Sequence, residues 1–158
     1  MREVKAPNLI SLSYEYRVFL AGSIEMGKAE LWQDKVVKGL EGLEVVVFNP
    51  RRDDWDSSWK QNKNDPQFRQ QVEWELNAMS GADLIVFYFD PNTKSPITLL
   101  ELGMHLQDHI VVCCPEGFYR KGNVDIVCEH NGIRQVDNLE ALIKITHDIV
   151  EDRTVGSW

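Results

Sequence analysis

Residues 83–105 read Asp-Leu-Ile-Val-Phe-Tyr-Phe-Asp-Pro-Asn-Thr-Lys-Ser-Pro-Ile-Thr-Leu-Leu-Glu-Leu-Gly-Met-His, and this stretch decides the fold. Residues 84–89 are apolar or aromatic and uncharged, which is typical of a central strand buried on both faces. Asp90 and Pro91 end this strand. Ser95 and Pro96 then predict a helix start, with Ser as N-cap and Pro in the first helical position. Glu101 follows within that helix, just past the carboxyl end of the strand, where open α/β sheets bind ligands. Glu101 is therefore the leading catalytic candidate.

The composition is that of an ordinary soluble globular protein. The 158 residues are 43% hydrophobic and 27% charged, and we expect one domain over residues 1–158. The net charge of −8 disfavours binding to a nucleic-acid polymer, which relies on clustered Lys and Arg. A small nucleoside is compatible with this charge, because its recognition depends on a pocket and not on the overall electrostatic field of the protein.

The three cysteines, Cys113, Cys114 and Cys128, are expected to be reduced core residues. Their number is odd, and the chain has neither a Cys-x-x-Cys pair nor a paired His motif, so a zinc site is disfavoured and we expect no metal or other cofactor. The first sixteen residues lack the apolar core of a signal peptide, and no apolar run approaches the length of a membrane span. We therefore expect a cytoplasmic protein that does not bind membranes.

Strand and helix patterns alternate five times along the chain. Residues 1–15 are mixed in character and predict an irregular lead-in. Apolar runs ended by Gly, Asn, Asp or Pro predict strands at 16–21, 44–48, 84–89, 110–114 and 132–136. Helical periods and start signals predict helices at 29–40, 66–80, from 96 onward and at 139–153. Residues 116–128 predict a loop with room for a short helix.

This alternation predicts an α/β fold, in which helices flank a doubly wound five-stranded parallel sheet of strand order 2-1-3-4-5. The carboxyl ends of the strands bring Gly22, Ser23, Asn49, Asp90 and Pro115 to one edge, where we expect the site. Glycine at a strand-to-helix turn lets backbone approach a ligand closely. A tight turn without a ligand explains Gly22 equally well.

Three other carboxylates are weighed beside Glu101. Asp90 lies at the carboxyl end of its strand, although Asp-Pro after a strand is also ordinary turn chemistry. Asp83 begins the same strand, at the opposite edge, and is expected to be structural. Glu75 lies near the end of its helix, and spacing does not show whether it reaches the site. For Glu101, the helix dipole and nearby hydroxyl donors would favour the charged form, against desolvation.

The polar segment 51–65 is too long for an ordinary connection and contains Trp55 and Trp59. Disordered loops rarely carry two tryptophans, so a functional loop is favoured. One of the two, with Trp55 the candidate for substrate binding, would stack against a base. The alternative is that they pack the loop onto the body of the protein or fill a subunit contact.

Three motifs occur in order along the chain: Val18-Phe-Leu-Ala-Gly-Ser-Ile24, Ala82-Asp-Leu-Ile-Val86, and Ser95 followed six positions later by Glu101-Leu-Gly-Met-His105. Together they resemble the nucleoside 2-deoxyribosyltransferase family and its hydrolytic relatives, the deoxynucleoside monophosphate N-glycosidases. The resemblance covers roughly residues 16–128. It implies a flavodoxin-like fold and a glutamate, matched by Glu101, that attacks C1′ of a 2-deoxyribosyl group.

The resemblance also implies roles for other residues. Glu75 matches an acidic residue that assists at the sugar or the base, as Glu where Asp is more usual. Ser95 matches a position held by Asp or Ser. Asn123 resembles an asparagine that a neighbouring subunit supplies to the site, which implies a homodimer or a higher oligomer. Glu25 stands where the glycosidases offer an arginine to a 5′-phosphate, which favours an unphosphorylated nucleoside.

The implied mechanism is attack by Glu101, a covalent glycosyl-enzyme, and capture by an acceptor. A second nucleobase as acceptor makes the protein a transferase, and water makes it an N-glycosidase. Glu75 or Asp90 would protonate the departing base. Two other hypotheses stay open: a non-catalytic nucleotide-sensing domain, and another enzyme of the same fold, such as one that cleaves the glycosidic bond of a dinucleotide cofactor.

Overall fold

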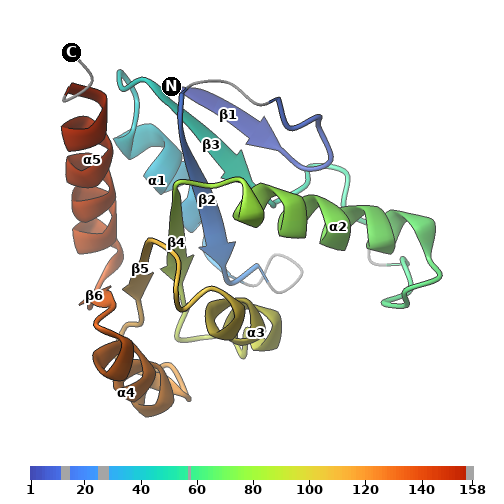
Figure 1. Cartoon of the computed structure of the whole chain (residues 1–158). Helices are drawn as coiled ribbons and strands as arrows, with labels where there is room; N and C mark the ends of the chain where they lie inside the picture. Colours follow the sequence, from blue (N-terminus) through green and yellow to red (C-terminus); the bar gives the residue numbers. More distant parts are fainter. Residues whose placement is uncertain (12–14, 25–28, 57, 156–158) are drawn as a thin grey trace.

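A parallel sheet of six strands forms the centre of the computed structural model, which describes residues 1–11, 15–24, 29–56 and 58–155 (Figure 1). Neighbouring strands are parallel throughout, in the order β1-β3-β2-β4-β5-β6. The strands are β1 (Arg2–Lys5), β2 (Tyr16–Gly22), β3 (Val45–Asn49), β4 (Leu84–Tyr88), β5 (Ile110–Cys113) and β6 (Arg134–Val136).

Without β1, this order is the predicted 2-1-3-4-5, so the α/β class and the doubly wound topology are confirmed. The predicted count of five strands is wrong by one, because part of the expected lead-in forms β1 at the edge of the sheet, beside β3. Of its four residues only Val4 is buried. A short edge strand with one apolar anchor lacks the continuous apolar run that marks the buried strands.

Two layers of helices cover the sheet in the described part of the chain (Figure 1). One core joins α1 and α5 to one face of the sheet, and the other joins α2, α3 and α4 to the opposite face. The helices are α1 (Trp32–Gly39), α2 (Pro66–Ser80), α3 (Pro96–Met104), α4 (Lys121–Asn131) and α5 (Leu139–Val155).

The alternation of side chains along β2 shows how one strand serves both cores. Val18 and Leu20 pack in the α1–α5 core, whereas Phe19 and Ala21 pack in the opposite core, and all four are at most 1% exposed. Successive side chains of a strand point to opposite faces, so a continuous apolar run is what a doubly covered strand requires.

Residues 116–128 were expected to form a loop with room for a short helix, and α4 occupies most of this segment and continues to Asn131, 11 residues in all. Only Val124 and Cys128 of its side chains are buried, one turn apart, and no side chain caps its start. Gly132 ends it with a φ of 65°. Two buried positions give too weak a period to mark a helix of this length from the sequence. Cys128 and the two strand cysteines are free and buried, as expected.

Candidate functional site

The carboxyl ends of β2 and β4 lie side by side, and the side chains that follow them meet there. Gly22 pairs with Tyr88 at the last register position of the two strands. Ser23 follows β2, and its hydroxyl oxygen accepts a hydrogen bond from the backbone N–H of Asp90 at 2.9 Å. The structure thus brings Ser23 and Asp90 together at this edge, as the sequence predicted.

Three buried hydroxyl groups form a cluster at this edge, contributed by Ser23, Thr93 and Ser95. The Thr93 hydroxyl oxygen lies 2.9 Å from that of Ser23 and 2.8 Å from that of Ser95, and the two serine hydroxyls are themselves hydrogen-bonded. Ser95 does not cap α3 as predicted. Its φ of 46° is left-handed, and its side chain makes no cap bond, because the hydroxyl is turned into the cluster.

Helices α2 and α3 cover the same face of the sheet, and they carry Glu75 and Glu101 respectively (Figure 1). The two carboxyl groups are near enough for the charge of Glu75 to act on Glu101. Burial, with the nearby charge of Glu75 adding to it, raises the pKa of Glu101 to about 8. Although Glu75 as a whole is only partly buried, desolvation of its carboxyl raises its pKa to about 7. The expected charged state of Glu101 therefore does not prevail in the free protein, because burial outweighs the helix dipole. Near neutral pH the two carboxyl groups retain protons.

Gln71 holds Glu75, and the sequence analysis missed it. Its side-chain Nε2 donates to the Glu75 Oε1 at 2.6 Å and to the carbonyl oxygen of Pro50, just past β3, at 2.9 Å. Gln71 is buried. The i, i+4 spacing of Gln71 and Glu75 on one helix was the available signal, because side chains four apart are neighbours.

Asp90 is buried, and both of its carboxylate oxygens hold loops in place. Oδ1 accepts from the backbone and side-chain N–H groups of Asn92 at 2.8 and 3.2 Å, and Oδ2 accepts from the backbone N–H of Glu30 at 3.1 Å. This geometry matches the structural alternative for Asp90, in which its side chain stabilises the turn after the strand.

Gly22 is required by close packing within the protein itself. A Cβ atom at this position would lie 2.5 Å from the carbonyl oxygen of Tyr88 and 2.6 Å from the ring of Trp32. The Trp32 indole N–H donates to the carbonyl of Ser23 at 3.0 Å, so the ring is fixed over the turn. This arrangement matches the alternative of a tight turn without a ligand.

A charged network that the sequence analysis also missed anchors the segment before α1. The hydroxyl of Tyr88 donates to the Glu30 Oε1 at 2.7 Å, and Lys35 donates to Oε2 at 2.6 Å. The guanidinium of Arg51 donates to the Glu30 carbonyl and to the side-chain oxygen of Gln33. Hydrogen bonds from Lys35 and Tyr88 lower the pKa of Glu30. No local sequence pattern predicts this network, because its residues come from four separate segments of the chain.

The remaining sequence candidates lie at the surface or outside the described residues. Trp55 is half-exposed and packs edge-on against Trp59, with ring centroids 5.0 Å apart, which matches the packing alternative for this loop. Asn123 is exposed on α4. Glu25 lies outside the described residues. Asp83 has the expected structural role, because its carboxylate accepts from the backbone N–H and the guanidinium of Arg17 at 2.9 to 3.0 Å.

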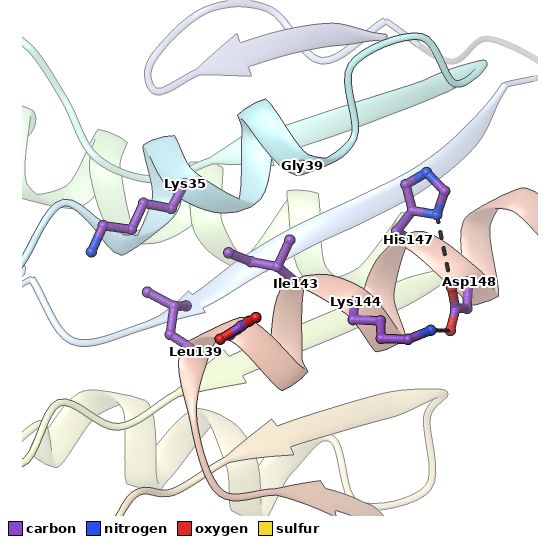
Figure 2. A pocket seen from close by; sticks show the side chains of 8 residues that line it. Lys35, Gly39, Leu139, Ile143, Lys144, His147 and Asp148 are labelled. Atoms are coloured by element: carbon purple, nitrogen blue, oxygen red, sulfur yellow. Dashed lines mark hydrogen bonds and ion pairs between the residues drawn. The ribbon is translucent and has the colours of Figure 1, made fainter.

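A cavity of about 490 Å³ lies away from this edge, between α1 and α5 (Figure 2). It contains none of the predicted site residues and lies on the face of the sheet opposite to α2 and α3. Of its two lysines, Lys144 is paired with Asp148 at 2.7 Å. Its lining consists of Lys35, Gly39, Leu139, Glu140, Ile143, Lys144, His147 and Asp148. We therefore place the candidate chemistry at the carboxylate pair and not in this cavity.

The described residues contain neither a metal-binding cluster of side chains nor a membrane-spanning helix. No group of three or more His, Cys, Asp or Glu side chains among them is arranged to hold a metal ion. Of the helices in the described part of the chain, none has the length and apolar character needed to cross a bilayer.

Comparisons with known proteins relate the chain to one family and to one fold. Residues 15–118 match a family model described as nucleoside 2-deoxyribosyltransferase like. No curated protein matches the sequence significantly. Seven chains of solved structures match the fold significantly. One is a conserved protein from Enterococcus faecalis V583, with a TM-score of 0.57 and 14% identity, over 82% of this chain and 96% of that one. At this identity the likeness concerns the fold alone.

Proposed function

Because this chain belongs to the nucleoside 2-deoxyribosyltransferase-like family, we propose that it moves a 2-deoxyribosyl group between nucleobases through a covalent glycosyl-Glu101. Family membership indicates an enzyme of the glycosyltransferase or glycosidase kind. The observation that supports the finer proposal is a pair of electrostatically coupled carboxyl groups, Glu75 and Glu101, on neighbouring helices of one face, both with pKa values raised by burial. Two such groups can act as nucleophile and acid in one reaction.

In the first half-reaction the ionised carboxylate of Glu101 attacks C1′ of the deoxynucleoside. A C1′–O bond forms as the C1′–N bond breaks, and the electron pair of the broken bond stays on the departing base. Glu75 donates a proton to that base, for which a pKa near 7 is well matched at neutral pH. The productive state of the pair has its proton on Glu75 and its charge on Glu101, which is the reverse of the order of the two pKa values in the free protein. Binding of the substrate must therefore favour ionisation of Glu101.

In the second half-reaction a nitrogen of another base attacks C1′ and releases Glu101. Glu75, now ionised, accepts the proton that the incoming base gives up, so the pair returns to its starting state. Asp90 is the weaker candidate for this acid–base role, because both of its oxygens already accept hydrogen bonds from the loops around it. Capture by water in place of a base would give an N-glycosidase.

For substrate binding we propose contacts from Ser23 and Ser95, whose hydroxyl cluster lies at the same edge of the sheet. Gly22 would contribute by shaping this turn, and Trp55 by covering the base from the 51–65 loop. The net charge of −8 and the two site carboxylates favour a neutral nucleoside over a nucleoside monophosphate.

We also propose that the active form is a homodimer or a higher homo-oligomer. The helix that carries Glu101 exposes Ile97, Leu100 and Met104, each more than half exposed, at i, i+3 and i+7. This spacing places them on one side of α3, a stripe that a second copy would bury. Asn123, exposed on α4, would then be supplied to the site of the neighbouring copy, as the family resemblance implies.

The test is to incubate the protein with deoxynucleosides, with and without a second free base, and to separate the products by chromatography. We expect base exchange, and we expect Glu101→Gln to lose it by at least about 10⁴-fold, as when a nucleophile is removed. Free deoxyribose without exchange would replace the transferase by an N-glycosidase. Binding of nucleosides without any turnover would replace the enzyme by a nucleotide sensor.

A further inference from the structure

Gln71 makes two short contacts from one buried nitrogen. It lies on α2 one turn before Glu75 and is 6% exposed. Its Nε2 donates one proton to the Glu75 Oε1 at 2.6 Å and the other to the Pro50 carbonyl at 2.9 Å. Both amide protons are therefore used, and the Glu75 carboxyl is tied to the segment that leaves β3.

The orientation of the Gln71 amide is set by its neighbours. The Pro50 carbonyl can only accept a hydrogen bond, so it requires the nitrogen and not the oxygen of the amide. In this orientation the Gln71 Oε1 is buried and has no hydrogen-bond partner among the described residues. A buried acceptor without a partner is unfavourable. The two hydrogen bonds of the amide nitrogen therefore hold the amide in an orientation in which its oxygen accepts none.

We propose that Gln71 is a positioning residue that fixes the Glu75 carboxyl and sets how readily this carboxyl gives up its proton in the presence of Glu101. The catalytic meaning of this inference rests on the proposed function, whereas its effect on the pair does not. Glu101 on α3 is the titratable group that faces Glu75. On α2 itself, Glu73 pairs with Arg69 at the exposed surface, at 2.6 Å.

The direction of the effect follows from what an amide donor stabilises. Gln71 donates to the ionised form of Glu75 and so lowers its pKa, against the larger effect of burial. The fully ionised pair always contains an ionised Glu75, and the fully protonated pair never does. Loss of the donor therefore raises the sum of the two midpoints at which the pair gives up its protons.

The first test titrates the carboxyl groups of the unliganded protein by carbon-13 NMR, with Glu75→Gln and Glu101→Gln used to assign the two signals. We expect Gln71→Met, which keeps length and removes the donor, to raise the sum of the two midpoints by about one pH unit. Gln71→Lys, which adds a positive donor, should lower this sum. The control Gln67→Met changes an exposed glutamine of the same helix and should leave the pair unchanged.

The second test follows the pH dependence of kcat/KM for base exchange in the same variants. The alkaline limb should move up in Gln71→Met and down in Gln71→Lys, with circular dichroism showing that both are folded. Unmoved NMR midpoints in folded Gln71→Met protein would overturn the inference. If the wild type turns over no substrate, the proposed function fails, and the NMR titration still decides the role of Gln71.

Discussion

Glu75 and Glu101 carry carboxyl groups that are buried and that repel each other when both are charged. In water each carboxyl would lose its proton at about pH 4.3, whereas in the folded protein both pKa values are raised toward neutrality. A pair with one proton and one charge is the state that retaining transfer needs, with one group as acid and the other as nucleophile. The desolvation that makes this pair useful also makes it unfavourable for folding once both groups are charged.

This conflict predicts how stability depends on pH. Between about pH 4.5 and 8 the folded state holds protons on the pair that the unfolded chain has released. The free energy of unfolding should therefore fall as pH rises through this window, by up to about 1.4 kcal/mol per pH unit for each proton held, and level off above it. Urea unfolding at a series of pH values measures this slope.

The double variant Glu75→Gln/Glu101→Gln should flatten the slope over the same window, because amides do not titrate. Glu73→Gln provides the control, since it alters an exposed carboxylate on the same helix. Equal slopes in the wild type and the double variant would show that the two carboxyl groups are ionised in the folded protein, contrary to this account.

Gly22 leads to a second prediction, about packing. A methyl group there meets the Trp32 ring and the Tyr88 carbonyl at distances that real Cβ atoms do not adopt. We expect Gly22→Ala to lower the free energy of unfolding by about 1–3 kcal/mol, the usual range for overpacking. Gly122→Ala is the matched control, because its Cβ would meet nothing within 4 Å and alanine favours a helix. Urea midpoints of both variants, with Trp fluorescence as the signal, decide the point.

Part of this site could be predicted from the sequence because motif residues carry it. Ser23 and Ser95 stand at a recognisable strand end and helix start, and Glu101 follows within the same helix. The contact of Gln71 with Pro50 and that of Thr93 with Ser23 could not be found in this way, because the partners lie far apart in the chain. Pro50 is 21 positions from Gln71, and Ser23 is 70 positions from Thr93. A single polar residue in a helix or loop gives no local pattern that reveals such a partner.

At the scale of elements, the strands covered on both faces were predictable and the marginal ones were not. β2 and β4 are continuous apolar runs because helices pack on both of their faces. β1 needs only Val4 in the core and takes the rest of its stability from pairing with β3, which leaves no apolar run to detect. α4 likewise has only two buried positions. Hydrophobic periodicity in the sequence reflects the burial of side chains, so elements with few buried side chains cannot be predicted from it.

α3 shows how one element can serve two purposes in the proposed enzyme. Thr98, Glu101 and Leu102 are its buried side chains and face the body of the protein. Its opposite side exposes three large apolar residues, although the helix lies at the site. A helix that is apolar nearly all round is typical of a buried position, which agrees with the proposed contact with a second copy.

At the scale of the whole molecule, the stripe on α3 predicts self-association that is coupled to activity. We expect Leu100→Lys to shift the protein from oligomer to monomer in size-exclusion chromatography with light scattering, because a buried lysine without a partner opposes the contact. The rate of base exchange should decrease as the oligomer dissociates if a neighbouring copy supplies Asn123 to the site. Leu31→Lys is the control: Leu31 is also more than half exposed, but it lies next to α1, on the other face of the sheet. A wild-type monomer, or a Leu100→Lys variant that stays oligomeric and active, would show that this stripe is not the interface.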